Sequence, residues 1–213
     1  MFKKNDFIEI DFTASIKETN HIFETTSEEV AKKNNFYNPK QKYKPRIICL
    51  GSNQLLPGLE KQLENKEIGK EYEIELSPEN AFGKKNPKLL QLVSMSSFKR
   101  QKINPYPRMQ VNIDNLIGVV RTVSGGRVIV DFNHPLSGKN IIYKIKILRL
   151  VNNVKEKISS IISQFTQKSE VEVKESEAIV KTDLPEPIKK ELPALITKLI
   201  PLIKKVSFSK YIE

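Results

Sequence analysis

Hydrophobic and polar residues alternate along the first part of the chain with the period of a β-strand. Residues 7–14 and 71–76 each place their apolar side chains on one face, as a strand with a single buried face does. Residues 46–50 carry adjacent isoleucines and form a further strand candidate, and residues 22–26 also have an extended pattern. The pattern predicts an antiparallel sheet with one face on the core.

Two short helices are predicted between these strands. Residues 27–33 begin with a serine and two acids, which is the composition of a capped helix start. In residues 55–64 the leucines recur at three- and four-residue spacing, and Pro57 falls near the start, where proline is tolerated. We therefore expect an α+β domain, a half-open barrel around a short helix.

A different pattern begins at residue 86. Segments with strand or helical-turn character follow one another at 89–93, 94–100, 110–113, 117–123 and 128–132. Ser124-Gly125-Gly126 predicts a hairpin, because glycine adopts positive φ at little steric cost. The stretch is too long for an ordinary connection, so we expect it to fold as its own small β-rich module. A strand at 140–150 then returns to the barrel.

Residues 153–213 form a third unit in the pattern. A helix is predicted over 154–165, with Ile158, Ile161, Ile162 and Phe165 on one stripe. Short strands are predicted at 171–174, 178–181 and 206–212, and a helix over 187–205 that Pro193 and Pro201 should kink or break. The unit is small for its apolar content, which predicts a marginal core and favours a homodimer through 153–213.

Composition narrows the function classes. The net charge is +11, and residues 84–130 hold nine basic residues and one acid, or +8 of it. This basic stretch lacks a recognised nucleic-acid motif and has few aromatic residues, so nucleic acid is a disfavoured partner. The single cysteine, Cys49, lies in an apolar run and predicts a buried thiol. With only two histidines, the chain shows no metal-ligand spacing and implies no cofactor.

No stretch approaches the length of apolar residues that a membrane helix needs, so no membrane association is expected. The chain begins with charged residues and passes directly into an alternating pattern, without the apolar core of a signal peptide. We therefore expect a cytoplasmic protein.

Three fragments carry a family resemblance: Leu55-Leu56-Pro57-Gly58-Leu59-Glu60, Ser77-Pro78-Glu79-Asn80-Ala81-Phe82-Gly83 and Asp131-Phe132-Asn133-His134-Pro135-Leu136. Together they resemble the FKBP-type peptidyl-prolyl isomerases, specifically the SlyD-like branch. The extension after residue 152 is similar to that of long archaeal-type members. The resemblance implies an FKBP-like half-open antiparallel barrel with an inserted insert-in-flap domain and a C-terminal α/β domain. The implied ranges are 1–85 plus 132–152, 86–131 and 153–213.

The resemblance also implies a site and its partners. It assigns the proline pocket, where the twisted amide is stabilised without proton transfer, to Phe23, Glu24, Leu55, Leu56, Leu59, Phe82, His134, Leu136 and Tyr143. It assigns contacts with unfolded, proline-containing polypeptides to Phe12, Leu89, Leu92, Val93, Met95, Phe98, Tyr106 and Met109. By pattern alone Phe12, Phe23, Leu59 and Tyr143 are ordinary core residues, and half of the insert residues belong to the insert's own core.

The chain departs from the family pattern at three places. Phe82 stands where the family usually has a tyrosine, Glu24 stands for an aspartate, and Phe12 lacks a common hydroxyl. Losing one hydrogen bond of about 1 kcal/mol slows an isomerase several-fold without abolishing an apolar mechanism. The leading hypothesis is thus a prolyl isomerase with chaperone activity. The alternatives are a non-catalytic chaperone or assembly module and, third, a basic nucleic-acid-associated protein.

Overall fold

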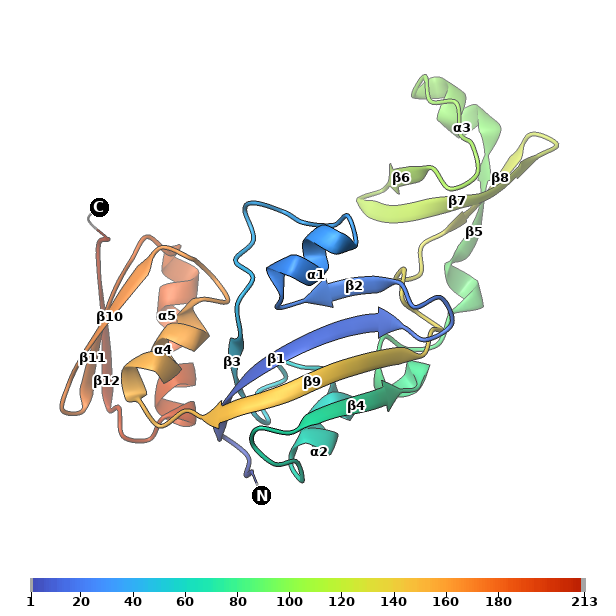
Figure 1. Cartoon of the computed structure of the whole chain (residues 1–213). Coiled ribbons are helices and arrows are strands. Elements are labelled where there is room, and N and C mark those ends of the chain that lie inside the picture. The colour runs from blue at the N-terminus through green and yellow to red at the C-terminus, as the bar shows by residue number, and fades with distance from the viewer. Residues whose placement is uncertain (1, 212–213) are drawn as a thin grey trace. The chain divides into compact units, whose positions relative to one another are not determined.

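The computed structural model describes residues 2–211, and this part of the chain forms two compact units (Figure 1). The first unit combines the residues up to Leu76 with those from Ile141 onward, and the second is Ser77–Asn140. None of the helices between residues 2 and 211 is long and apolar enough to span a membrane.

The first unit contains a five-stranded antiparallel sheet. Its strands are β1 (Phe7–Ile16), β2 (Ile22–Thr25), β3 (Arg46–Cys49), β4 (Glu71–Leu76) and β9 (Ile141–Leu150). The order is β2-β1-β9-β4, and β3 pairs with the first half of β1. Nine residue pairs join β1 to β9, with Phe12 opposite Ile145 and Ala14 opposite Tyr143. The predicted strands are confirmed, and the register between them comes from the tertiary structure.

The sheet buries the face that the alternation predicts. On β1 the even-numbered side chains from Ile8 to Ile16 are buried, and on β9 the odd-numbered ones from Ile141 to Ile147 are buried. Helix α1 (Glu28–Lys33) starts at Ser27, whose hydroxyl accepts a hydrogen bond from the Val30 amide. Helix α2 (Pro57–Leu63) has Pro57 in its first turn and inserts Leu59 and Leu63 into the core.

The C-terminal part of the first unit is a three-stranded sheet with two helices on one face (Figure 1). Its elements are α4 (Val154–Ile162), β10 (Ser169–Lys174), β11 (Glu177–Thr182), α5 (Glu186–Leu199) and β12 (Lys205–Ser209). The apolar stripes of the two helices form one core with Phe7 of β1 and Cys49 of β3. These two side chains point away from the barrel interior, toward the C-terminal helices. The C-terminal segment therefore completes a core that the barrel begins.

Several C-terminal expectations need correction. Helix α5 does not break at Pro193 but continues through it, because Leu192, Ile196 and Leu199 anchor both halves in the same core. The helix ends at Leu199, shortly before Pro201. Phe165 lies beyond the end of α4 and is 45% exposed, so it does not extend the buried stripe. The predicted last strand reached Ile212, which is outside the described residues.

The second unit is a four-stranded antiparallel sheet of order β5-β8-β7-β6 with one short helix. Its elements are β5 (Leu90–Ser94), α3 (Met95–Arg100), β6 (Gln110–Ile113), β7 (Leu116–Ser124) and β8 (Arg127–Asp131), preceded by single 3-10 turns at Pro78–Asn80 and Pro87–Leu89. Gly125 and Gly126 have φ values of 54° and 75°, which confirms the predicted hairpin between β7 and β8.

The second unit is wider than the expected 86–131 module, because it also contains 77–85 and 132–140. Backbone bonds close its base: the Gly138 amide donates to the Gly83 carbonyl at 2.8 Å, and the Phe132 amide donates to the Leu89 carbonyl at 2.9 Å. Residues 153–211 belong to the same compact unit as the barrel, whereas the sequence pattern alone separated them.

Candidate active site

A cluster of apolar side chains lies on the buried face of the barrel sheet. The rings of Phe12 on β1 and Tyr143 on β9 are 5.8 Å apart at 45°, and the two residues are 3% and 4% exposed. They approach because Tyr143 is paired with Ala14, two residues along the same face of β1 from Phe12. Leu59, from the first turns of α2, is completely buried. The sequence placed all three residues on buried faces, and the structure confirms this.

The Tyr143 hydroxyl remains protonated in this environment. Burial raises the pKa of Tyr143 well above its usual range, and the nearby Glu24 carboxylate adds to the rise. No residue in the described part of the chain accepts a hydrogen bond from this hydroxyl. The group can therefore donate to a ligand that enters the apolar cluster.

Glu24 is held by an arginine that the sequence did not single out. Its Oε1 is 2.7 Å from Nη1 of Arg46, at the start of β3. The same guanidinium lies 5.1 Å from the centroid of the Phe12 ring. Phe23 precedes Glu24 on β2 and is half-buried. The carboxylate, the guanidinium and the aromatic ring thus form one group at the side of the cluster.

Leu55 and Leu56 lie immediately before α2 and are half-buried. The Leu56 carbonyl accepts the first helical bonds, from the amides of Leu59 at 2.8 Å and Glu60 at 3.1 Å. The Glu60 carboxylate folds back and accepts from the amides of Gly51 at 3.2 Å and Leu55 at 3.5 Å. Glu60, in the Leu-Pro-Gly-Leu-Glu fragment, therefore holds the loop that presents the two leucines.

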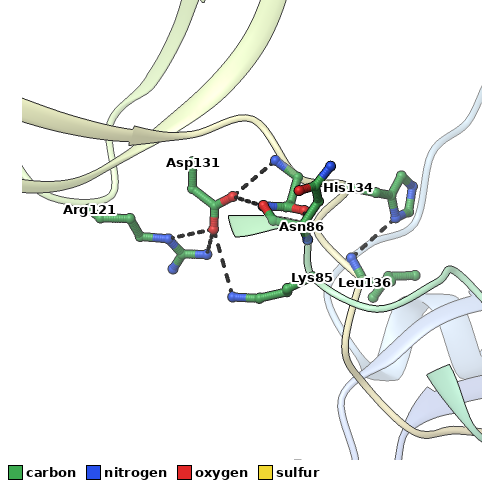
Figure 2. Close-up of polar contacts among 7 residues, drawn as sticks. Lys85, Asn86, Arg121, Asp131, His134 and Leu136 are labelled. Carbon is green, nitrogen blue, oxygen red and sulfur yellow. Dashed lines mark hydrogen bonds and ion pairs between the residues drawn. The ribbon is translucent and has the colours of Figure 1, made fainter. Parts of the chain in front are cut away.

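The other predicted pocket residues belong to the second unit. The rings of Phe82 and His134 stack at 4.8 Å and 5°. The His134 Nδ1 accepts from the Leu136 amide at 3.2 Å, a bond drawn in Figure 2. The Ser137 hydroxyl donates to the Phe82 carbonyl at 3.2 Å, which ties the two segments together. Phe82 is distant in sequence from His134 and Leu136, but these contacts bring the three residues together within the second unit.

Asp131 organises the base of the second unit (Figure 2). Its Oδ2 accepts from Arg121 Nε at 3.0 Å and Nη2 at 2.7 Å, with Lys85 Nζ at 3.7 Å. Its Oδ1 accepts from the Asn133 amide at 2.9 Å and side chain at 2.8 Å. Asn133 in turn exchanges hydrogen bonds with the backbone of Asn86. The carboxylate thereby joins the chain entering the sheet to the chain leaving it.

The acidity of Asp131 reflects this setting. Burial alone would raise its pKa, but the hydrogen bonds from Asn133 and Arg121 outweigh burial and hold the pKa at about 2. The carboxylate is 3% exposed and stays ionised under all ordinary conditions. A buried charge with this many donors is a structural anchor.

The proposed client contacts divide between two environments. Phe98, at 3% exposed, fills the core of the second unit, and Val93, Met95 and Met109 are packed against it. Leu92 and Tyr106 are each 62% exposed, and Leu89 is half-buried. Burial rules out Phe98 as a client contact, because a module of this size needs its large side chains for its own core.

Strand pairing shows an exposed apolar face of which the sequence analysis named only Leu92. Leu92 lies opposite Ile129, and both are exposed; Leu90, two residues before Leu92 on β5, is exposed on the same face, as is Ile117 farther along β7. We call Leu90, Leu92, Ile117 and Ile129 the open sheet face. The alternation of Ile129 with the buried residues Val128 and Val130 is visible in the sequence, but only the register shows that Ile129 meets Leu92.

Comparison with protein-family models gives two matches. The model described as FKBP-type peptidyl-prolyl cis-trans isomerase matches residues 1–96. The model described as FKBP26, IF domain matches residues 91–136, which lie in the second unit.

Curated relatives point to the same family. A short-type peptidyl-prolyl cis-trans isomerase of Methanocaldococcus jannaschii is 28% identical, over 69% of this chain and 92% of its own. A probable FKBP-type 16 kDa peptidyl-prolyl cis-trans isomerase of Pseudomonas fluorescens is 33% identical, over 49% of this chain and 71% of its own. An FKBP-type isomerase SlyD of Helicobacter pylori is 31% identical, over 49% and 58%.

The residues matched by the FKBP-type isomerase model include the barrel strands β1 to β4, the loop before α2 and the segment that carries Phe82. The family resemblance drawn from the three sequence fragments is therefore confirmed. With the FKBP-like fold, the clustered aromatic residues and these relatives together, the chain belongs to the FKBP-type peptidyl-prolyl cis-trans isomerases.

Proposed function

We propose that the chain isomerises X–Pro bonds in unfolded polypeptides through the apolar cluster of its barrel and holds those polypeptides on its second unit. Rotation about an X–Pro bond is slow because the planar amide loses resonance over a barrier of about 20 kcal/mol. A twisted amide is less charge-separated than a planar one, so a dry apolar pocket stabilises it relative to the ground state. No proton transfer is needed.

The observation that carries the catalytic part is the buried ring pair of Phe12 and Tyr143. It combines buried rings with a protonated tyrosine hydroxyl that has no partner among the described residues. Such a group bonds a substrate carbonyl while the apolar walls exclude water. Tyr143 thus supplies a donor on the barrel side, although Phe82 and Phe12 lack the hydroxyls that the family resemblance implies at their positions.

The resemblance assigns Phe82, His134 and Leu136 to proline binding, and we keep this assignment within the proposal. Phe82→Tyr tests it, since it restores the family hydroxyl on the same ring. We expect the variant to turn over a short proline peptide several-fold faster, as one added hydrogen bond of about 1 kcal/mol predicts. Unchanged turnover would remove Phe82 from the site, and no turnover in the parent would favour a non-catalytic binding module.

The open sheet face supports the chaperone part of the proposal. Its four apolar side chains are between 38% and 62% exposed and lie on neighbouring strands. Exposed apolar side chains gathered on one sheet face are typical of interaction sites for other chains. A client held there has a raised effective concentration of its prolines near the barrel.

The test is a paired measurement on Leu92→Lys with Ile129→Lys. We expect this variant to lose much of its catalysis of protein refolding and its suppression of aggregation while keeping short-peptide turnover. The matched control, Gln91→Lys with Gln101→Lys, adds the same charge at exposed sites of the same unit away from the open sheet face. Equal losses in both variants, or in both assays, would contradict the division of labour.

Two further expectations stay predictions. A homodimer through 153–213 would bury little of that segment's apolar surface, because most of its apolar residues lie in the core shared with the barrel. Leu202 and Leu195 are its exposed leucines, at 70% and 37%. Light scattering on the full chain decides the oligomeric state. Cytoplasmic location is tested by cell fractionation.

A further inference from the structure

A basic cleft lies within the first unit, between the barrel and helix α4. It has a volume of about 940 Å³. One side is lined by the loop and strand residues Gln41, Lys42, Lys44, Pro45, Arg46, Ile47 and Ile48 with Gln54 and Leu55, and the other by residues of α4 and of the loop after it. We call it the lysine cleft, after Lys42, Lys44 and Lys155. Its volume is at the upper end of the range for small-molecule sites, which suits a segment of polypeptide.

The ion pairs of the lining leave positive charge over. Its two carboxylates, Glu9 and Glu156, are both engaged by Arg149, with N···O distances of 2.6 Å each. Arg46 is paired with Glu24 at 2.7 Å. In contrast, Lys42, Lys44 and Lys155 form no ion pair with any acid between residues 2 and 211. Three exposed ammonium groups therefore line a cleft whose two carboxylates are already paired with Arg149.

The loop that carries two of these lysines is ordered. Lysine or arginine recurs at every second position from Lys40 to Arg46, although residues 1–83 as a whole carry an excess of acids. The intervening Tyr43 is fixed: its ring stacks on Tyr37 at 5.5 Å, and its hydroxyl accepts from the Asn38 amide at 3.0 Å. Anchoring Tyr43 holds Lys42 and Lys44 in place on either side.

The lysine cleft adjoins the apolar cluster of the barrel. Leu55 lines the cleft and belongs to the residues assigned to the proline pocket. Arg46 also lines the cleft, while its guanidinium lies over the Phe12 ring at 5.1 Å. A polypeptide with its proline at Phe12 and Tyr143 therefore reaches the cleft within a few residues.

A polypeptide fits this cleft better than a nucleic acid does. Ile47 and Ile48 of β3 line it, and β3 pairs only with β1 among the described strands, so it is an edge strand. Edge strands offer backbone groups to an extended peptide. Serine and glutamine side chains from α4 and the loop after it provide further hydrogen-bond donors. Among the described residues, no aromatic side chain lines the cleft on which a nucleic-acid base could stack.

We propose that the lysine cleft binds the part of the substrate polypeptide next to the proline and selects acidic residues there. This inference rests on the proposed isomerase function, because it defines which X–Pro sites that function prefers. The preference is electrostatic and exposed, so it weakens as salt shortens the screening length from about 10 Å at 0.1 M to about 3 Å at 1 M.

The experiment uses the full chain and proline peptides with one X–Pro core, extended on either side by a run of Glu or a run of Gln. At low salt we expect a Glu extension on one of the two sides to raise kcat/KM about tenfold over the matching Gln extension. Three exposed charge contacts of ordinary strength give an effect of this size. In the triple variant Lys42→Gln, Lys44→Gln and Lys155→Gln, the Glu-to-Gln ratio falls toward one.

The matched control replaces Lys61, Lys146 and Lys190 by Gln. These lysines are exposed in the same unit and outside the cleft, so both triple variants lower the net charge equally from +11. We expect the control to keep the Glu preference. An equal loss of the Glu preference in both variants would assign the preference to net charge and refute selection by the lysine cleft.

Binding measured in parallel separates this inference from the isomerase proposal. Labelled Glu- and Gln-extended peptides are titrated by fluorescence anisotropy, which needs no turnover. If the chain turns over both peptides but shows no Glu preference in either assay, the proposed acidic selectivity of the lysine cleft is wrong and the isomerase proposal stands. If the Glu peptide binds more tightly in a way that depends on the cleft lysines, but no peptide is turned over, the isomerase proposal is wrong and the cleft proposal stands. A short oligothymidylate that displaces the Glu peptide at equal charge, and loses binding only in the cleft variant, would identify a nucleic-acid site instead.

Discussion

Asp131→Asn removes the buried charge at the base of the second unit and should destabilise that unit. The amide has the shape of the carboxylate and keeps one oxygen for the two Asn133 bonds. Its NH₂ group then faces the Arg121 guanidinium, so two charge-assisted bonds of 2.7 and 3.0 Å are lost. The substitution therefore isolates the contribution of the charge.

The pKa gives the magnitude. Lowering it from the ordinary 3.8 to about 2 corresponds to roughly 2 kcal/mol of stabilisation of the folded second unit, at 1.36 kcal/mol for each pH unit. Because the pKa of the folded state is the lower one, this stabilisation is complete above about pH 5 and is lost as the pH falls from about 4 to 2. Asp131→Asn should lack it at every pH.

Native-state hydrogen exchange is the suitable assay, because it resolves the two units separately. Amides of β7 and β8 should exchange about 30-fold faster in Asp131→Asn at neutral pH, and those of β9 should change little. Asp114→Asn is the control, an exposed aspartate in the same unit at positive φ, which asparagine tolerates. Unchanged protection in β8, or the same loss in the control, would refute the anchoring role of the carboxylate.

Three other substitutions or reagents test the packing. Gly118→Ala brings a Cβ within 2.6 Å of Val130 Cγ1 and 2.7 Å of Phe132 Cδ1, so it should destabilise the second unit by about 1–3 kcal/mol; wild-type protection of β8 would contradict this. Ile158→Ala should cost the first unit about 2–5 kcal/mol and expose amides of β1 as well as α4, because Ile158 and Phe7 share a core; a loss confined to residues after 153 would disprove the sharing. Burial raises the pKa of the Cys49 thiol to about 11, so a disulfide reagent at pH 8 should react only as fast as the first unit unfolds, and an immediate reaction would refute this. Since the folded pKa is the higher one, stability also falls as the pH rises above about 8.5.

The sequence predicted the elements well where side-chain period alone decides them. The alternation in β1, β4 and β9, the serine before α1 and the glycine pair of the β7–β8 hairpin are local features, and each is confirmed. The break that local preference allows at Pro193 does not occur, because a helix anchored by apolar contacts on both sides of a proline tolerates the missing hydrogen bond.

The candidate site was predictable only in part. The order of Leu-Pro-Gly-Leu-Glu, Ala-Phe-Gly and the His134 segment indicated the family, and the alternating pattern placed Phe12 and Tyr143 on buried faces. Arg46 carried no such signal. It meets Glu24 because β2 and β3 pair side by side with β1, and nothing in the spacing of the two residues reveals that pairing.

By itself, then, the sequence determined which side chains are apolar, where turns occur and to which family the fragments belong, since these depend on neighbours along the chain. The tertiary structure decided which faces meet. It joined Phe7 and Cys49 to the C-terminal helices, brought Leu92 opposite Ile129, and turned the lysines of one loop toward α4. Those outcomes depend on register and on long-range packing, where a shift of one residue would send every side chain of a strand to the opposite face.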